Sequence, residues 1–274
     1  MINNKNKIYK LKNKKKIKFT IITVVLNAEK FLEKTILSLK SQNSKNYEFI
    51  IVYTPSKDKT WNLIYKYKKF IDKIIINYEI GVYPAMNVGI KYAKGEYINF
   101  LNAGDYFYNT KTLNDIIKFA NINMDVIYGD SQVLYKNYKK KLPALSINQI
   151  YNGMIFSHQS CYIKTQILKK NYFNLKYMYA SDYDQILRLF NKNLNFVKLN
   201  KILSISKPDG IADKNRFKTI KENLLIVFRQ NKKKIVFSII IFVKKFIYFA
   251  FLKLLILILS RKQYEKIKNI KDAT

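Results

Sequence analysis

A carboxylate follows a predicted buried strand at a position where an α/β protein could use it for chemistry. The stretch Gly81–Asp105 reads as a helix, a turn, a strand over 96–101 and a polar loop that ends at Asp105. Open α/β sheets bind their ligands beyond the carboxyl ends of their strands. A carboxylate held there, next to the small Gly104, could bind a divalent cation on a diphosphate. The alternative is a polar turn that caps a helix predicted over 109–121.

Two more acidic residues stand at the start of an amphipathic helix predicted over 180–191. Asp182 and Asp184 both lie in its first turn, where negative charge interacts favourably with the helix dipole. These side chains can be simple helix-terminal charges, or one of them can act as a catalytic acid or base. Spacing alone leaves both interpretations open.

The chain has one histidine and one cysteine, which limits its metal chemistry. His158 precedes Gln159, where a strand over 159–164 is predicted, and the single cysteine is Cys161. Zinc sites built from several His or Cys ligands are therefore excluded. A lone cysteine also excludes an internal disulfide framework and fits a reducing compartment.

The chain is strongly basic, with 51 Lys and Arg against 18 Asp and Glu and a formal net charge of +33. Such a field favours anionic partners, namely anionic lipid, nucleic acid or phosphate-bearing substrates. We expect an anionic membrane surface to be the partner, and compositional drift is the alternative source of part of the charge. No nucleic-acid-binding motif is present, so we expect no nucleic acid partner.

The elements that would position these residues alternate between strand and helix. Buried strands are predicted over 19–26, 47–53, 74–76 and 96–101, with helices over 29–41, 58–69 and 83–94 between them. This alternation predicts an α/β fold with a mostly parallel, doubly wound sheet. The Rossmann glycine fingerprint is missing after the first strand, which disfavours a dinucleotide oxidoreductase, and a Walker loop is also absent.

The second half has a less regular pattern. Besides the elements above, it predicts strands over 125–128, 196–199 and 202–206, a hairpin over 132–141 turned at Lys136-Asn137, a turn over 207–210 and a helix over 222–229.

Both ends of the chain differ in composition from its centre. Residues 1–16 are rich in Lys and Asn and predict a disordered basic tail. The segment 235–260 is apolar apart from Lys244, Lys245 and Lys253. Two of these lysines fall mid-segment, where burial in a bilayer is costly, so we expect a monotopic anchor that lies in the membrane interface. A membrane span and a soluble core helix are the alternatives.

Six motifs in order resemble a known family. They are TVVLNAEKFLEKTILSLKSQ, SKDKT, GVYPAMNVGI, GEYINFLNAGD, HQS and ASDYDQILRL. Together they resemble the family 2 inverting glycosyltransferases of the GT-A fold over about residues 17–210, and most of all the bacterial subgroup that builds surface polysaccharides.

The resemblance implies a site and a reaction. Asp105 matches the last residue of the family's Asp-x-Asp signature, which binds a divalent metal, Mn²⁺ or Mg²⁺. Asp182 matches the catalytic base, which takes the proton from an acceptor hydroxyl as it attacks the anomeric carbon. The nucleotide-diphosphate sugar, in the first place a UDP-sugar, would contact Thr23, Val25, Asn27, Tyr53, Asp58, Asn87, Asn102, Gly104, His158 and Gln159.

The resemblance also implies an acceptor and a location. We expect a lipid-linked glycan acceptor and a place at the cytoplasmic face of the bacterial inner membrane, peripheral or monotopic. The expected divisions are a tail over 1–16, a GT-A domain over 17–212 with halves 17–106 and 107–212, and a C-terminal helical membrane-associating segment over 213–274.

Several positions depart from the family pattern. Tyr53 stands where an Asp usually holds the uracil, the usual glycines of the next loop are Thr54 and Pro55, and Pro84 replaces a common Asp. Gly104 stands where many members have a ribose-binding Asp. Either the base of the donor is held differently, or the protein is a catalytically impaired scaffold subunit of a polysaccharide assembly complex.

Overall fold

A computed structural model of the chain describes residues 7–10, 17–119, 124–208, 210 and 215–258. Its strands are β1 (Lys7–Lys10), β2 (Phe19–Val25), β3 (Tyr47–Tyr53), β4 (Lys73–Ile76), β5 (Tyr97–Phe100), β6 (Tyr106–Phe107), β7 (Val126–Leu134), β8 (Lys139–Leu142), β9 (Cys161–Lys164) and β10 (Phe196–Ser206).

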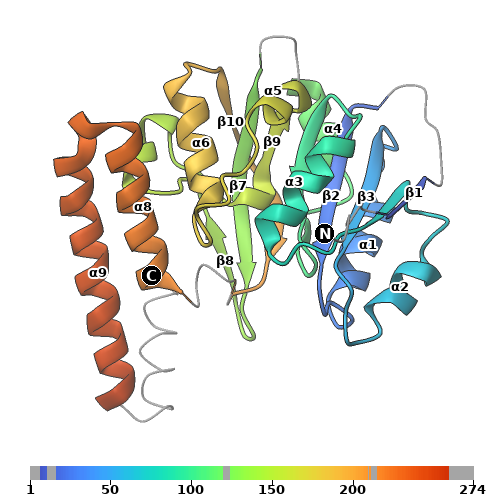
Figure 1. Ribbon diagram of the computed structural model, residues 1–274, viewed down its shortest axis with the longest axis horizontal. Helices are drawn as coiled ribbons and strands as arrows, with labels where there is room; N and C mark the ends of the chain where they lie inside the picture. Colours follow the sequence, from blue (N-terminus) through green and yellow to red (C-terminus); the bar gives the residue numbers. More distant parts are fainter. Residues whose placement is uncertain (1–6, 11–16, 120–123, 209, 211–214, 259–274) are drawn as a thin grey trace, which may run out of the picture.

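The helices lie between and after these strands (Figure 1). They are α1 (Leu32–Lys40), α2 (Thr60–Lys66), α3 (Val82–Tyr92), α4 (Thr112–Phe119), α5 (Thr165–Lys170), α6 (Ser181–Asn191), α8 (Arg216–Gln230) and α9 (Ile235–Ile258), with 3-10 helices η1 (Ile147–Asn152), η2 (His158–Ser160) and η3 (Lys232–Lys234).

Within the described residues, all strands join one sheet in the order β1-β4-β3-β2-β5-β9-β7-β10-β6, and β8 pairs with β7. The segment β4-β3-β2-β5 is parallel, as the alternation of strand and helix predicts. The other half is mixed, because β7 and β10 are parallel while β9, β8 and β6 pair antiparallel with their neighbours. The predicted strands over 196–199 and 202–206 are one strand, β10, with a register shift between Leu199 and Ile202.

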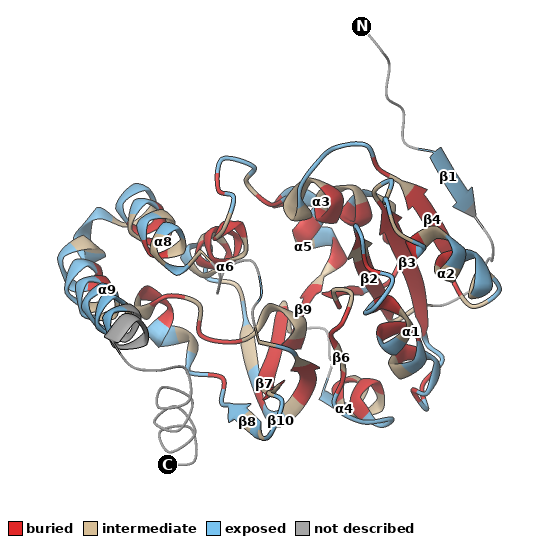
Figure 2. Ribbon diagram, turned by 90° about the horizontal axis from the view of Figure 1, so that it is seen from below, coloured by how far each residue is buried: buried red, intermediate tan, exposed pale blue. Residues whose placement is uncertain are grey.

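Helices cover both faces of the parallel segment, so the side chains of each central strand pack into two hydrophobic cores, one on each face. Ile21 of β2 packs in the cluster that contains Leu32 and Ile36 of α1, whereas Ile22 packs in the cluster that contains Met86 and Ile90 of α3. Successive side chains of a strand point to opposite faces, which explains this division. All seven residues of β3 are buried (Figure 2), as expected for a central parallel strand.

Part of the predicted disordered tail over 1–16 forms a strand. Residues Lys7–Lys10 form β1, an exposed edge strand that pairs antiparallel with β4 (Figure 2), so the prediction of disorder is wrong there. Residues 1–6 and 11–16 lie outside the described residues, and so does Asp209 of the predicted turn.

The helices α8 and α9 lie side by side next to α6 (Figure 1). Ile220, Ile226 and Val227 of α8 are buried in the same core as Tyr183 and Leu187 of α6. Helix α9 presents an apolar face to solvent, with Val236, Ile240 and Ile247 more than half exposed. None of the described helices is long and apolar enough to cross a membrane.

A buried ion pair between β3 and β4 holds the backbone that leads into β5. Glu48 and Lys73 are 2% and 6% exposed, and Lys73 Nζ lies 2.8 Å from Glu48 Oε2. Glu48 also accepts hydrogen bonds from Thr20 Oγ1 at 2.7 Å and from the backbone N–H groups of Lys94 and Gly95. One carboxylate therefore joins three segments of the chain.

We expect Glu48→Ala to lower the free energy of unfolding by about 3–5 kcal/mol, because it leaves Lys73 buried without its partner. Urea denaturation of the variant and the wild type measures this difference. The control is Glu33→Ala, which breaks the exposed pair with Lys66 and should have a far smaller effect. Equal losses from the two variants would contradict the assignment.

Candidate active site

Asp105 lies in the loop after β5, and helix α1 holds that loop in place. Thr35 Oγ1 of α1 donates to the backbone O of Asp105 at 2.8 Å and accepts from the N–H of Gly104 at 2.9 Å. Gly104 has a φ of +100°, a conformation that favours glycine, and a Cβ there would also lie 3.4 Å from Phe31 Cβ. The glycine is thus required by the backbone that presents Asp105.

The Asp105 carboxylate is almost completely buried, with 8% exposure. Among the described residues, Gln159 is the side chain that donates to it, from Nε2 to Oδ2 at 2.7 Å. Burial raises the pKa of Asp105 to about 7, although the hydrogen bond from Gln159 opposes this shift. A bound cation would stabilise the ionised carboxylate of Asp105 and so displace its proton.

His158 precedes Gln159, the hydrogen-bond donor to Asp105, and packs among aromatic rings. Its ring centroid lies 5.2 Å from that of Phe100, in a stacked arrangement, and 5.8 Å from that of Phe173. Burial lowers the pKa of His158, while the negative charge of Asp182 opposes the shift. Its Nε2 is buried and has no hydrogen-bond partner among the described residues. A neutral imidazole with a free nitrogen can face a ligand.

Asp182 lies in the first turn of α6, and Tyr83 of α3 orients its carboxylate. Its Oδ1 accepts from Tyr83 Oη at 3.0 Å and from the N–H of Tyr183 at 2.9 Å. Burial raises the pKa of Tyr83, and the charge and hydrogen bond of Asp182 add to the shift. Tyr83 therefore stays a hydrogen-bond donor that holds the carboxylate in one direction.

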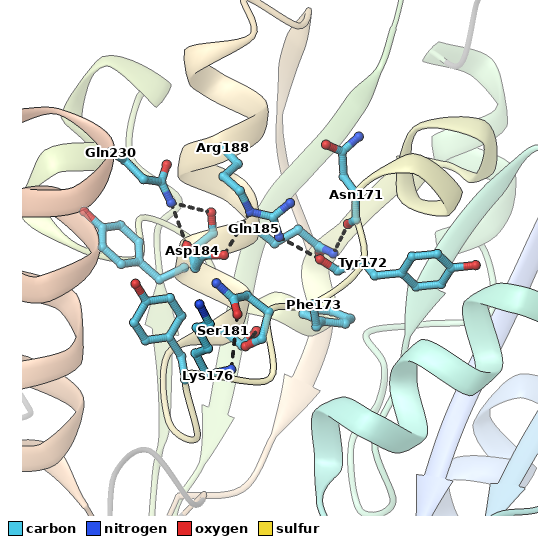
Figure 3. A network of polar contacts seen from close by, with 12 residues as sticks. Asn171, Tyr172, Phe173, Lys176, Ser181, Asp184, Gln185, Arg188 and Gln230 are labelled. Atoms are coloured by element: carbon cyan, nitrogen blue, oxygen red, sulfur yellow. Dashed lines mark hydrogen bonds and ion pairs between the residues drawn. The ribbon is translucent and has the colours of Figure 1, made fainter.

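Asp184, two residues further along, has a structural role. It is buried and accepts from Arg188 Nε at 2.9 Å and from Gln230 Nε2 of α8 at 2.7 Å (Figure 3). Because these partners occupy both oxygens, Asp184 is a helix-terminal charge that joins α6 to α8. The two acidic residues of the helix start thus differ in their surroundings.

A continuous series of contacts connects the two candidate carboxylates. Asp105 binds Gln159, whose neighbour His158 packs on Phe173. The Phe173 ring lies 5.3 Å from that of Tyr83, which donates to Asp182. Segments that are distant in sequence, from β5, η2, α3 and α6, thus meet at one edge of the sheet.

The other predicted donor residues on the first strand and on α3 support the backbone. Thr23 is buried and donates to the backbone O of Leu101 at 2.7 Å, and Val25 is buried in the core. The Asn87 amide donates to and accepts from the backbone of Phe173, at 3.0 and 2.9 Å. The side-chain contacts of Thr23 and Asn87 are thus made with the backbone that surrounds the site.

Predicted donor residues also lie in and before the loops that follow β2 and β3, and their polar groups form hydrogen bonds within and between these loops. Asn27, with a φ of +50°, accepts from the N–H of Lys57 at 2.9 Å. Asp58 accepts from the N–H of Glu29 at 3.0 Å and from Thr60. Tyr53 Oη accepts from the N–H of Ser56 at 3.0 Å.

Asn102, like His158, was predicted to contact the donor sugar nucleotide and has a buried polar atom without a partner among the described residues. Its backbone O accepts from the N–H of Asp105 at 2.9 Å, while its Oδ1 is buried without a hydrogen-bond partner among the described residues. A buried oxygen of this kind normally has a partner. It is therefore a candidate contact for a ligand at this edge.

Sequence reasoning missed three residues that build the site: Thr35, Tyr83 and Phe173. Tyr83 lies in the motif that follows Gly81, but nothing in its spacing points to Asp182, which is 99 residues away. Thr35 and Phe173 act through a hydroxyl and a ring that local pattern assigns to the core.

The described residues contain no group of three or more His, Cys, Asp or Glu side chains that could hold a metal ion. A single carboxylate still fits Mg²⁺ or Mn²⁺ on a nucleotide, because Mg²⁺ keeps several waters and is usually held by one or two carboxylates plus phosphate oxygens. Asp105 is such a carboxylate, and its raised pKa is the response of a buried acid that lacks a countercharge.

The chain is similar to known glycosyltransferases. The chain is 41% identical over 101 residues to UDP-Glc:alpha-D-GlcNAc-diphosphoundecaprenol beta-1,3-glucosyltransferase WfaP of Escherichia coli, a match that covers 35% of this chain and 39% of WfaP. The match thus spans well under half the length of that relative.

Solved structures show the same fold. S. aureus TarS 1-349 in complex with UDP-GlcNAc gives a TM-score of 0.64 at 20% identity, over 78% of this chain and 68% of that chain. Mannosyltransferase PcManGT from Pyrobaculum calidifontis, in complex with GDP-Man and Mn²⁺, gives a TM-score of 0.63 at 14% identity, over 82% of this chain and 69% of that chain. These likenesses confirm the predicted GT-A-type fold.

The family description Glycosyl transferase family 2 matches residues 20–196, which is more than half of the sequence. The family suggested by the six motifs is therefore confirmed, and the chain belongs to glycosyl transferase family 2.

Proposed function

We propose that the protein is an inverting, metal-dependent glycosyltransferase that moves a sugar from a UDP-sugar to a lipid-linked glycan. The observation that carries the proposal is the series of contacts from Asp105 through Gln159, His158 and Phe173 to Asp182. It supports a donor site and an acceptor site at one edge of the sheet. The name of WfaP, which gives a UDP-sugar donor and a diphosphoundecaprenol acceptor, supports the substrate classes.

Asp182 acts as the general base in this proposal. Its carboxylate takes the proton from the acceptor hydroxyl while the hydroxyl oxygen attacks the anomeric carbon, and the bond from that carbon to the diphosphate breaks. Attack opposite the leaving group inverts the anomeric configuration. Tyr83 and the N–H of Tyr183 both donate to Oδ1, which leaves Oδ2 to face the acceptor.

Asp105 holds the cation of the donor in this proposal. A bound Mg²⁺ or Mn²⁺ would offset the charge that develops on the departing diphosphate. Gln159 orients the Asp105 carboxylate, and the neutral imidazole of His158 faces the diphosphate without adding a charge. The PcManGT complex, which contains Mn²⁺, supports a metal in this fold.

The uracil cannot be held here by an aspartate at the end of β3, because that position is Tyr53 and its hydroxyl binds the N–H of Ser56. Tyr53 is 8% exposed, and its ring lies 5.1 Å from that of Trp61. This departure is the observation that favours the second candidate function, a catalytically impaired subunit that binds but does not transfer.

One experiment separates the two functions. The purified chain is incubated with UDP-Glc or UDP-GlcNAc, Mn²⁺ and GlcNAc-diphosphoundecaprenol, and UDP release is followed with and without the acceptor. Acceptor-dependent release supports transfer. Donor binding in a thermal-shift measurement, without release for any donor in a panel of UDP-sugars, supports the impaired subunit.

We also propose that the region 213–274 docks on an anionic membrane surface through α9, at the cytoplasmic face of the inner membrane. Ile240 and Ile247 of α9 are 52% and 61% exposed, and Lys244 lies exposed between them. The lysines of η3 precede the helix. Apolar side chains beside lysines fit the boundary between acyl chains and phosphates.

We expect the double variant Ile240→Glu/Ile247→Glu to bind phosphatidylglycerol vesicles at least about tenfold more weakly than the wild type. Vesicle sedimentation measures the binding. The matched control, Ile80→Glu/Leu175→Glu, changes the net charge equally at two exposed apolar residues outside α9. An equal loss of binding in the control would show that charge alone is responsible, and would contradict docking through α9.

A further inference from the structure

The backbone just before Asp182 is held by a single carboxylate from α8. Glu222 Oε1 accepts from the N–H of Met178 at 2.9 Å, and Oε2 accepts from the N–H groups of Tyr179 and Ala180 at 2.8 and 2.9 Å. Ala180 is the residue before α6, and that helix start has no side-chain cap of its own. Three consecutive N–H groups thus converge on one anion.

Such an arrangement is strong and directional. Hydrogen bonds to an ionised acceptor are roughly twice as strong as neutral ones, and successive backbone N–H groups form an anion-binding nest. Met178 itself is 70% exposed, whereas Ala180 is 2% exposed and the next residue, Ser181, donates from Oγ to the backbone O of Asn174 at 2.9 Å. The Glu222 carboxylate is therefore one of the contacts that set the direction in which α6 begins, and with it the direction of Asp182.

Glu222 also lies close to the groups that orient Asp182. Its charge contributes to the raised pKa of Tyr83, the tyrosine that donates to Asp182. Helix α8 lies outside the residues 20–196 that match the family, and its Ile226 and Val227 are buried against the α6 core. The helix is therefore a fixed support of the site rather than an appendage.

We propose that Glu222 is a positioning residue of the active site, which sets the orientation of the general base Asp182 through the backbone of residues 178–180. The inference rests on the proposed function for the role of Asp182, but the hydrogen bonds of Glu222 do not. It makes the segment beyond the family's matched region a part of the catalytic apparatus.

The test compares Glu222→Gln with a matched change on the same helix. The amide replaces one oxygen by an NH₂ group, which then faces a backbone N–H instead of accepting from it. The control is Gln230→Ala, which removes the contacts of α8 with Asp184 and leaves residues 178–180 alone. Both variants loosen the α6–α8 contact, so loss of stability alone does not distinguish them.

We expect Glu222→Gln to lower kcat by about tenfold to a hundredfold, since misplacement by about 1 Å can cost that much. The KM for the UDP-sugar should stay unchanged, because Asp105 and Gln159 are untouched. Gln230→Ala should lower the melting temperature and keep kcat within about twofold. Turnover is followed as UDP release with UDP-Glc, Mn²⁺ and GlcNAc-diphosphoundecaprenol.

A second readout needs no substrate. We expect the imidazole signals of His158, the single histidine, to respond to Asp182, because the charge of Asp182 opposes the lowering of the pKa of that ring by burial. Glu222→Gln should move these signals in the direction that Asp182→Asn does, and Gln230→Ala should leave them in place. Unmoved signals, or equal effects of the two α8 variants, would overturn the inference. If Asp182→Asn itself leaves kcat intact, the proposed function fails, but the signal test of Glu222 still stands.

Discussion

Asp182→Asn is expected to lower kcat by at least about a hundredfold, while the affinity for the UDP-sugar should stay within about twofold. A positioned general base contributes typically 10²–10⁴-fold, and the amide cannot take the proton of the acceptor hydroxyl. Asn keeps an oxygen that accepts from Tyr83 and Tyr183, so the local structure should persist. Steady-state UDP release and calorimetric titration of the donor measure the two quantities.

The control for this variant is Asp184→Asn, in the same turn of the same helix. Asp184 is paired with Arg188 and Gln230, so this change should lower the melting temperature and leave kcat within a fewfold. The assay is run well below both melting temperatures. Full activity in Asp182→Asn, or an equal loss of kcat in both variants, would show that Asp182 is not the base.

Asp105→Asn is expected to abolish metal-dependent donor binding and, at the same time, to stabilise the ligand-free protein at pH 8. The folded-state pKa of Asp105 is about 7, above its ordinary value of 3.8. The folded state therefore holds the proton more tightly, and stability falls as the pH rises from about 4 to about 7. At about 1.4 kcal/mol for each pKa unit, the cost above pH 7 is at most about 4 kcal/mol.

Asn removes this buried charge, so we expect a gain of about 1–3 kcal/mol in the free energy of unfolding at pH 8 and little difference at pH 4. Urea denaturation at the two pH values measures the gain. Stabilisation by UDP with Mn²⁺ should be present in the wild type and absent in the variant. A variant that is less stable than the wild type at pH 8 would show that the buried charge of Asp105 does not destabilise the ligand-free protein.

The sequence predicted best the elements whose form is set by local pattern and burial. The strand Tyr47–Tyr53 has the predicted bounds, because a continuous apolar run fits the middle of a parallel sheet. The hairpin turned at Lys136-Asn137 is also confirmed, with Leu134 paired to Lys139. The edge strand Lys7–Lys10 was not predictable, because pairing with β4 creates it and its own side chains carry no strand pattern.

The same distinction holds at the site. Asp105 could be placed at the end of a strand from the sequence, and the loop geometry agrees. The contacts of Asp105 with Gln159 and Thr35 could not be predicted, because these residues come from segments that only the fold brings together. Asn87 shows the limit of motif reasoning, since both ends of its amide bind the backbone of Phe173.

If the cation of the donor and the general base flank His158, a paramagnetic cation must broaden the NMR signals of that histidine. We add Mn²⁺ and UDP to the protein labelled at its single histidine. We expect strong paramagnetic broadening of the imidazole signals that requires both Mn²⁺ and UDP and disappears in Asp105→Asn. Sharp imidazole signals in a sample whose UDP and Mn²⁺ are demonstrably bound would place the donor away from Asp105 and His158.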